Sequence, residues 1–340
     1  MIFVESLIGA AERAPWPDVA TRAGVHWLVS RTRRRLAVAP VADRDFAEAM
    51  ARLPIAMHAD AANAQHYEVP AAFFGLTLGP RRKYSCCYYE DGAKSLADAE
   101  RSALEASVRR ANLSDGQRIL ELGCGWGSLS LFMAQLYPNA QIVAVSNSAS
   151  QRAFIETQAA QRGLRNLQVV TADMNAFRPT GQFDRIVSIE MFEHMANWRA
   201  LLTRMREWLA PKGRVFIHIF THRTSCYRFD HEDKSDWIAQ HFFTGGVMPS
   251  HGLLREFSNL FAIEQEWRWS GVNYARTALD WLGNFDAAGD EIDAILEKTY
   301  GAEARLWRRR WRLFFLATAG LFGDSGGAEW GVSHYRLKAT

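Results

Sequence analysis

The chain has 340 residues, of which 48% are hydrophobic and 23% charged, and its formal net charge is +3. This length and composition allow a large buried core and exclude an intrinsically disordered chain. The basic residues are spread along the sequence, and the longest apolar run is shorter than the roughly 20 residues of a membrane helix, so neither a nucleic-acid partner nor a membrane span is expected.

The N-terminal region, residues 1–85, is rich in Ala, Arg and Leu and shows no strand-like alternation. It predicts short helices separated by prolines, and we expect these helices to contribute to a cleft. Residues 86–340 are expected to form the main domain. This domain opens with a helix over about 95–111 that has a capping residue at its start.

Short apolar strands alternate with helices through the middle of the chain. The strands are predicted at 118–122, 142–146, 167–171, 183–189 and 215–220, and helices are predicted at 149–162 and 198–209. This alternation indicates a Rossmann-like, doubly wound α/β fold with a parallel sheet covered on both faces. Ligands of such sheets bind beyond the carboxyl ends of the strands, so residues just after each strand are the candidates for function.

Residues 221–250 interrupt this pattern because they are rich in His, Asp, Phe and Gly and show little periodicity. We interpret them as an insertion that covers part of the cleft. The sheet is then predicted to resume at 262–269 and to close at 330–337. Helices are expected between these strands, around 277–284 and 290–321.

A glycine-rich loop follows the first predicted strand. Gly123, Gly125 and Gly127 allow a sharp turn and a close approach of a ligand to main-chain amides. A dinucleotide fingerprint needs Gly-x-Gly-x-x-Gly, whereas here the third glycine comes four positions after the first and an acid, Glu121, precedes the loop. The loop therefore predicts a ligand other than a dinucleotide, and a purely structural strand-to-helix turn is the alternative.

Three titratable side chains follow the fourth predicted strand. Glu190, Glu193 and His194 lie within five residues of one another. If this segment begins a helix, Glu190 shares a face with each of the other two. Such groups can accept a proton or hold a cation. The alternative is that Glu190 caps a helix and Glu193 is a solvated surface residue.

Several motifs together resemble the cyclopropane fatty acid synthase-like methyltransferases, a family that includes plant coclaurine and pavine N-methyltransferases. The motifs are residues 84–89, 121–127, 188–195, 242–250 and 329–334, and the resemblance covers about residue 67 to the C-terminus. It implies a class I methyltransferase fold over residues 86–340. It also implies S-adenosylmethionine as cofactor and S-adenosylhomocysteine as its product.

The resemblance implies a set of residues that hold the cofactor. Gly123 and Gly125 would lie against the methionine part of the cofactor, and Tyr84 and Ser85 near its carboxylate. Asn147 and Gln151 would face the ribose, and Asp173 and Met174 the adenine. Many related sheets have an acid where this chain has Asn147. Without the resemblance, Asp173 is better explained as a turn or cap residue.

The same resemblance implies that Glu190, Glu193 and His194 serve substrate binding and catalysis. Glu68 resembles a further carboxylate that binds the amine. Cyclopropane synthases usually carry glycine at the position of Glu190 and aspartate at that of Glu68, so both residues favour the amine branch. We therefore expect N-methylation of a small, mostly apolar amine.

The alternative function is carbon methylation of unsaturated fatty acyl lipids. Cys86, His218 and Tyr274, together with Glu193, resemble residues that hold a bicarbonate base in cyclopropane synthases. Bicarbonate and a lipid substrate therefore stay open. The alternative explanation is that His218 and Tyr274 are ordinary residues at strand ends and that Cys86 is a small buried side chain.

The cysteines and the N-terminus bear on the compartment in which the protein works. The four cysteines lack the spacing of a zinc site and do not look like a disulfide framework, so no metal is expected. The first residues have no basic stretch before an apolar one, unlike a secretory signal. We expect a cytoplasmic protein. Attachment to a membrane surface through the basic stretch 305–312 and assembly as a homodimer both stay open.

Overall fold

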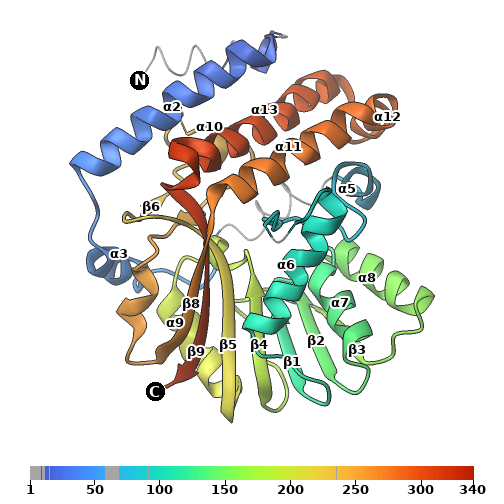
Figure 1. Cartoon of the computed structure of the whole chain (residues 1–340), viewed down its shortest axis with the longest axis vertical. Coiled ribbons are helices and arrows are strands. Elements are labelled where there is room, and N and C mark those ends of the chain that lie inside the picture. Colours follow the sequence, from blue (N-terminus) through green and yellow to red (C-terminus); the bar gives the residue numbers. More distant parts are fainter. Residues whose placement is uncertain (1–8, 10–11, 15, 58–68, 91, 235) are drawn as a thin grey trace.

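The computed structural model describes residues 9, 12–14, 16–57, 69–90, 92–234 and 236–340. A seven-stranded sheet with the order β3-β2-β1-β4-β5-β9-β8 forms its centre (Figure 1). The strands are β1 (Arg118–Leu122), β2 (Gln141–Ser146), β3 (Leu167–Thr171), β4 (Phe183–Ile189), β5 (Leu209–His222), β8 (Phe261–Ser270) and β9 (Trp330–Ala339). The expected α/β, Rossmann-like class is confirmed.

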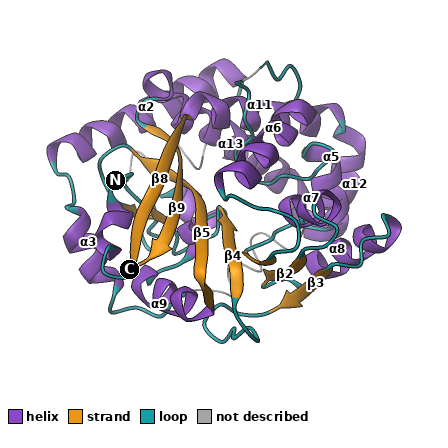
Figure 2. Cartoon of the chain, turned by 60° about the horizontal axis from the view of Figure 1, so that its bottom comes forward, coloured by secondary structure: helices purple, strands orange, loops and turns teal. Residues whose placement is uncertain are grey.

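Helices cover both faces of the sheet and one of its ends, as Figures 1 and 2 show. On one face lie α6 (Leu96–Arg110), α7 (Ser128–Leu136) and α8 (Ala149–Gln161). On the other face lie α3 (Asp43–Met50) and α9 (Trp198–Trp208). A second core joins α2 (Asp18–Val38), α5 (Ala71–Thr77), α11 (Gly271–Ala287), α12 (Gly289–Tyr300) and α13 (Ala304–Gly323).

The sheet is mostly parallel, as the alternating strands predicted, but the pairing of its last two strands makes it mixed. Strands β1 to β5 are parallel, whereas β9 runs antiparallel to both β5 and β8. The physical reason lies in where the chain enters the sheet. A short turn after α13 delivers Trp330 beside His222, at the carboxyl end of β5, so the chain can only run back along the sheet from there.

Two predicted helical regions also differ from the structure. Helix α2 has 21 residues and is not short, because no proline interrupts the chain between Pro17 and Pro40. The predicted helix over 290–321 is divided into α12 and α13. Gly301 ends α12 with a φ of 53°, a left-handed conformation that favours glycine.

The insertion at 221–250 folds back over the end of the sheet. It contains β6 (Tyr227–Arg228), α10 (Trp237–His241) and β7 (Val247–Met248), and the two strands pair with each other. Among the described residues, no helix combines the length and the apolar character that crossing a membrane requires.

Candidate active site

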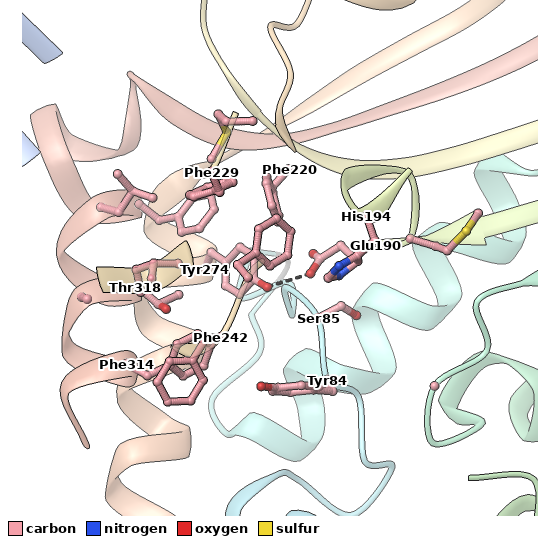
Figure 3. A pocket seen from close by; sticks show the side chains of 18 of the residues that line it. Tyr84, Ser85, Glu190, His194, Phe220, Phe229, Phe242, Tyr274, Phe314 and Thr318 are labelled. Carbon is pink, nitrogen blue, oxygen red and sulfur yellow. Dashed lines mark hydrogen bonds between the residues drawn. The ribbon is translucent and has the colours of Figure 1, made fainter. Parts of the chain in front are cut away.

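A cavity of about 930 Å³ lies beyond the carboxyl ends of β1 to β4. Its wall combines residues that follow these strands with residues of α2, α11, α13 and the insertion. The expected cleft, with the insertion as one of its walls, is therefore present. Figure 3 shows Glu190, His194 and Ser85 on one side of the view and Phe229, Phe314 and Thr318 on the other.

The glycine loop after β1 borders the cavity. Its start is fixed because the N–H groups of Gly123 and Cys124 both donate to the carbonyl of Val145 in β2. Gly123, Gly125 and Gly127 all have positive φ. This geometry explains why glycines occupy these three positions.

The three glycines face different surroundings. A Cβ at Gly123 would lie 2.6 Å from the side chain of Met191, and one at Gly127 would lie 2.6 Å from Ile155. A Cβ at Gly125 would meet no atom within 4 Å, and Gly125 lines the cavity. The expectation that Gly127 clears space for a ligand is therefore wrong, because Gly127 permits packing against α8. Gly125 is the position that leaves room for a ligand.

Glu121, at the end of β1, is buried beside the loop and accepts a hydrogen bond from the Ser130 hydroxyl. Burial raises the pKa of Glu121 to about 8, and the hydrogen bond from Ser130 only partly opposes this. The carboxyl group therefore holds its proton in the folded protein at a pH at which an unfolded glutamate is ionised.

The Glu121→Gln variant is expected to change how stability depends on pH. Because the folded pKa of about 8 exceeds the unfolded value of 4.5, the wild type loses stability as pH rises between these values, whereas the uncharged amide does not. Each unit of pKa difference corresponds to about 1.4 kcal/mol. Urea unfolding at about pH 5 and pH 8 measures the free energy of unfolding of both proteins. Relative to the wild type, the variant should be more stable at pH 8 than it is at pH 5. Parallel changes in the two proteins would contradict a buried, protonated Glu121.

The residues expected at the cofactor's carboxylate, ribose and adenine all line the cavity: Tyr84, Ser85, Asn147, Gln151, Asp173 and Met174. Gln151 is already engaged, since its side-chain oxygen accepts a 2.6 Å hydrogen bond from the Ser146 hydroxyl. Asp173 accepts a 2.9 Å hydrogen bond from the backbone N–H of Asn175. It is thus a turn residue that also lines the cavity.

Glu190 follows β4 in a left-handed conformation with a φ of 46°, which is unusual for a residue other than glycine. Its carboxylate oxygen Oε1 accepts hydrogen bonds from the backbone N–H of Cys86 at 2.9 Å and from Nε2 of His218 at 3.1 Å. Its Oε2 accepts one from the hydroxyl of Tyr274 at 2.7 Å (Figure 3). Four segments that are distant in sequence thus meet at one carboxylate.

The segment after β4 does not begin an α-helix at Glu190. Only a 3-10 helix, Phe192–His194, follows it. The helical spacing used to pair Glu190 with Glu193 and His194 therefore does not apply. The bend after β4 sets the direction of the Glu190 carboxylate. Holding a residue other than glycine in the left-handed backbone conformation costs about 1–3 kcal/mol, and such strain is common at functional sites.

The groups around Glu190 are largely neutral donors. Burial lowers the pKa of His218 well below its usual value, so its imidazole is neutral and Nε2–H donates to Glu190. Burial, and then the nearby charge of Glu190, raise the pKa of Tyr274 well above its usual value. For Glu190 itself, burial raises the pKa, and the positive charge of Lys83 is the largest opposing influence.

Glu193 and His194 occupy different surroundings. His194 lines the cavity and packs against Phe243, with ring centroids 4.4 Å apart. Glu193 is 0% exposed and does not line the cavity, so it is not the solvated residue of the alternative explanation. Its Oε1 accepts a 2.9 Å hydrogen bond from the N–H of Phe220. Burial, followed by the charge of Glu190, raises the pKa of Glu193 well above its usual value.

Cys86 and His218 also lie behind the cavity wall, whereas Tyr274 reaches the cavity. Glu68 lies outside the described residues. The sequence reasoning missed an aromatic region at the other side of the cavity, which includes Phe220, Phe229, Phe242 and Phe314 (Figure 3). Three of these come from the end of β5 and from the insertion, whose richness in Phe is the signal that could have revealed them. Buried Lys83 was missed as well.

The chain is similar to known proteins. The family described as mycolic acid cyclopropane synthetase matches residues 56–325. (S)-Coclaurine N-methyltransferase of Thalictrum flavum subsp. glaucum is 35% identical over 292 residues, which cover 84% of this chain and 81% of that enzyme. Cyclopropane-fatty-acyl-phospholipid synthase of Escherichia coli strain K12 is 30% identical over 230 residues, which cover 67% of this chain and 57% of that enzyme.

A solved structure supports the same relationship. The crystal structure of coclaurine N-methyltransferase bound to N-methylheliamine and SAH matches with a TM-score of 0.91 at 32% identity. The match covers 98% of this chain and 99% of that one. The family match spans most of the sequence and includes both the glycine loop and the segment after β4 that carries Glu190. The chain therefore belongs to the cyclopropane synthase-like family of S-adenosylmethionine-dependent methyltransferases.

Proposed function

We propose that the protein transfers a methyl group from S-adenosylmethionine to the nitrogen of a small, mostly apolar amine. The observation that carries this proposal is the carboxylate of Glu190, which is held by Cys86, His218 and Tyr274 and lines a cavity that also holds many aromatic side chains. A fixed carboxylate among aromatic rings suits an apolar molecule that carries one amine. The similarity to coclaurine N-methyltransferase over most of the chain supports the same substrate class.

The cavity fits the cofactor at the glycine loop. The open space beside Gly125 and the polar groups of Ser85, Asn147 and Asp173 offer room and hydrogen-bonding partners on one side of the cavity. We assign cofactor contacts to the eight expected residues: Tyr84, Ser85, Gly123, Gly125, Asn147, Gln151, Asp173 and Met174. When bound, S-adenosylmethionine supplies an electrophilic methyl group on its sulfonium.

The remaining residues handle the amine and its proton. A protonated amine is not a nucleophile, so the site has to attract the cation and then accept its proton. We assign attraction of the cation to Glu190 and Glu68. His194, which faces the cavity, is the candidate proton acceptor. Because Glu193 is buried behind the wall, we assign it to supporting this site and not to direct contact with the amine.

Methylation of lipid carbon is the second candidate function, and one observation weighs against it. The groups expected to hold bicarbonate are engaged elsewhere: Cys86, through its N–H, His218 and Tyr274 all donate to the carboxylate of Glu190. A second anion at these donors would have to displace that carboxylate and lie beside its charge. The cavity therefore favours the amine.

The expected result with labelled S-adenosylmethionine is transfer of the methyl group to amines. The test incubates the enzyme with a panel of apolar secondary amines and with vesicles of unsaturated phospholipid, each with and without bicarbonate. We expect amines to gain one CH₂ in mass without any need for bicarbonate. A gain on the unsaturated lipid alone, dependent on bicarbonate, would overturn the proposal in favour of the second candidate.

We further propose that residues 1–85 form a helical N-terminal region that contributes to the cavity. Helix α2 supports this division, because Ala20, Gly24 and Leu28, at successive four-residue spacing, line the cavity. We also propose a cytoplasmic location, supported by the four cysteines, which are all buried and free.

A further inference from the structure

A lysine is buried next to the cofactor end of the cavity. Lys83 is 2% exposed and lines the cavity wall. Its Nζ donates to the hydroxyl of Ser85 at 2.5 Å and to the carbonyl of Cys86 at 2.6 Å. Among the described residues no carboxylate forms an ion pair with it. A buried ammonium is costly unless it is compensated, so a lysine retained here calls for an explanation.

Lys83 is connected to Glu190 through a single residue. The carbonyl of Cys86 accepts from Lys83, and the N–H of Cys86 donates to Glu190. The backbone of Lys83 is itself fixed, because its N–H donates to buried Glu100 at 3.1 Å. The ammonium is therefore held in a defined position relative to the carboxylate.

Among the described groups close to the carboxylate of Glu190, Lys83 is the one that carries a positive charge. The groups around that carboxylate are Lys83, Cys86, Cys87, Glu193, His218 and Tyr274. The two thiols and the phenol have raised pKa values and His218 has a lowered one, so these groups are neutral. The pKa of Glu193 is raised well above its usual value by burial and then by the charge of Glu190, which favours its protonated form. Arg110 lies farther away, beyond His218, where it contacts His334.

We propose that Lys83 is a positioning residue that keeps Glu190 ionised, so that the carboxylate can hold the cationic amine. This inference rests on the proposed function. The lysine has two connected tasks. Its positive charge compensates the negative charge of Glu190. Its hydrogen bonds to Ser85 and Cys86 fix the position of this segment, which donates to Glu190 and borders the space for the cofactor.

The first test is the dependence of kcat/KM on pH in Lys83→Met. Without the positive charge the pKa of Glu190 rises, so ionisation is lost at a higher pH and the acid limb moves upward. An opposite charge nearby typically shifts a pKa by about 1–3 units, and a shift on this scale is expected. Lys83→Arg should keep the limb near its wild-type position. Lys212→Met, which removes an exposed lysine far from the cavity, should not move it.

A second test does not depend on turnover. Urea unfolding of Lys83→Met, Glu190→Gln and the double variant measures their coupling at neutral and at acid pH. We expect the double variant to be less destabilised than the sum of the single variants at neutral pH. This coupling should fade at acid pH, where Glu190 becomes protonated. If Lys83→Met does not fold, Lys83→Gln replaces it, since the amide removes the charge and keeps a donor.

These outcomes separate the inference from the proposed function. If no amine is methylated but the coupling is present and depends on pH, the charge pairing stands while the amine assignment fails. If amines are methylated, an unmoved acid limb together with additive destabilisation would overturn the role of Lys83. A loss of activity with an unshifted pH profile would show that Lys83 only holds the fold, and this too would overturn it.

Discussion

The Gly125→Leu variant is expected to lose binding of S-adenosylmethionine and S-adenosylhomocysteine while keeping its fold. A Cβ added at this position would meet no protein atom within 4 Å, and Gly125 lines the cavity. A leucine there occupies the space that the cofactor needs. The backbone already has a φ of 51°, and a left-handed residue other than glycine costs about 1–2 kcal/mol, which a domain of this size can tolerate. Calorimetry measures the binding, and circular dichroism checks the fold.

Gly163→Leu is the matched control for this substitution. Gly163 has a φ of 68°, has no atom within 4 Å of an added Cβ, and does not line the cavity. The Gly163→Leu variant should lose about as much stability from its backbone conformation as Gly125→Leu does. Its affinity for the cofactor should be that of the wild type. Gly123 is less suitable, because an added Cβ would strike Met191 and would disturb packing as well as binding. Full affinity in Gly125→Leu would show that the cofactor does not bind against this loop.

The strands and helices were predictable because their signals are local. The apolar run Phe183–Ile189 was predicted with the bounds that β4 has, and Ser95 caps α6 through the N–H of Asp98. The direction of β9 was not predictable, because alternation of apolar residues is the same in parallel and antiparallel strands. It depends on how the helices after β8 return the chain to the sheet.

The members of the active site were easier to predict than their arrangement. The glycine loop and the acids after β4 stand at strand ends, where an α/β sheet binds its ligands. The contact between Cys86 and Glu190 joins residues 104 positions apart, which no spacing rule reveals. A left-handed Glu190 and a buried Lys83 both go against residue preferences. Such departures from local rules are expected where function sets the structure.

The His194→Ala variant is expected to turn over amines about 10²- to 10⁴-fold more slowly, the usual contribution of a general base. His194 lines the cavity beside Phe243, whereas Glu193 is buried behind the wall and has a pKa well above its usual value. Because the raised pKa favours the protonated form of Glu193, glutamine is a close substitute that can still accept from the N–H of Phe220. Glu193→Gln should therefore cost less than His194→Ala.

Single-turnover kinetics and calorimetry with S-adenosylhomocysteine provide the measurement for His194→Ala, because they separate the transfer step from cofactor binding. The rate of transfer should fall while the affinity for the product cofactor stays that of the wild type. His26→Ala, which changes an exposed histidine of α2 outside the cavity wall, is the control and should behave as the wild type. If Glu193→Gln proves the more damaging variant, the proton is accepted by a group behind the wall, and the assignment of His194 fails.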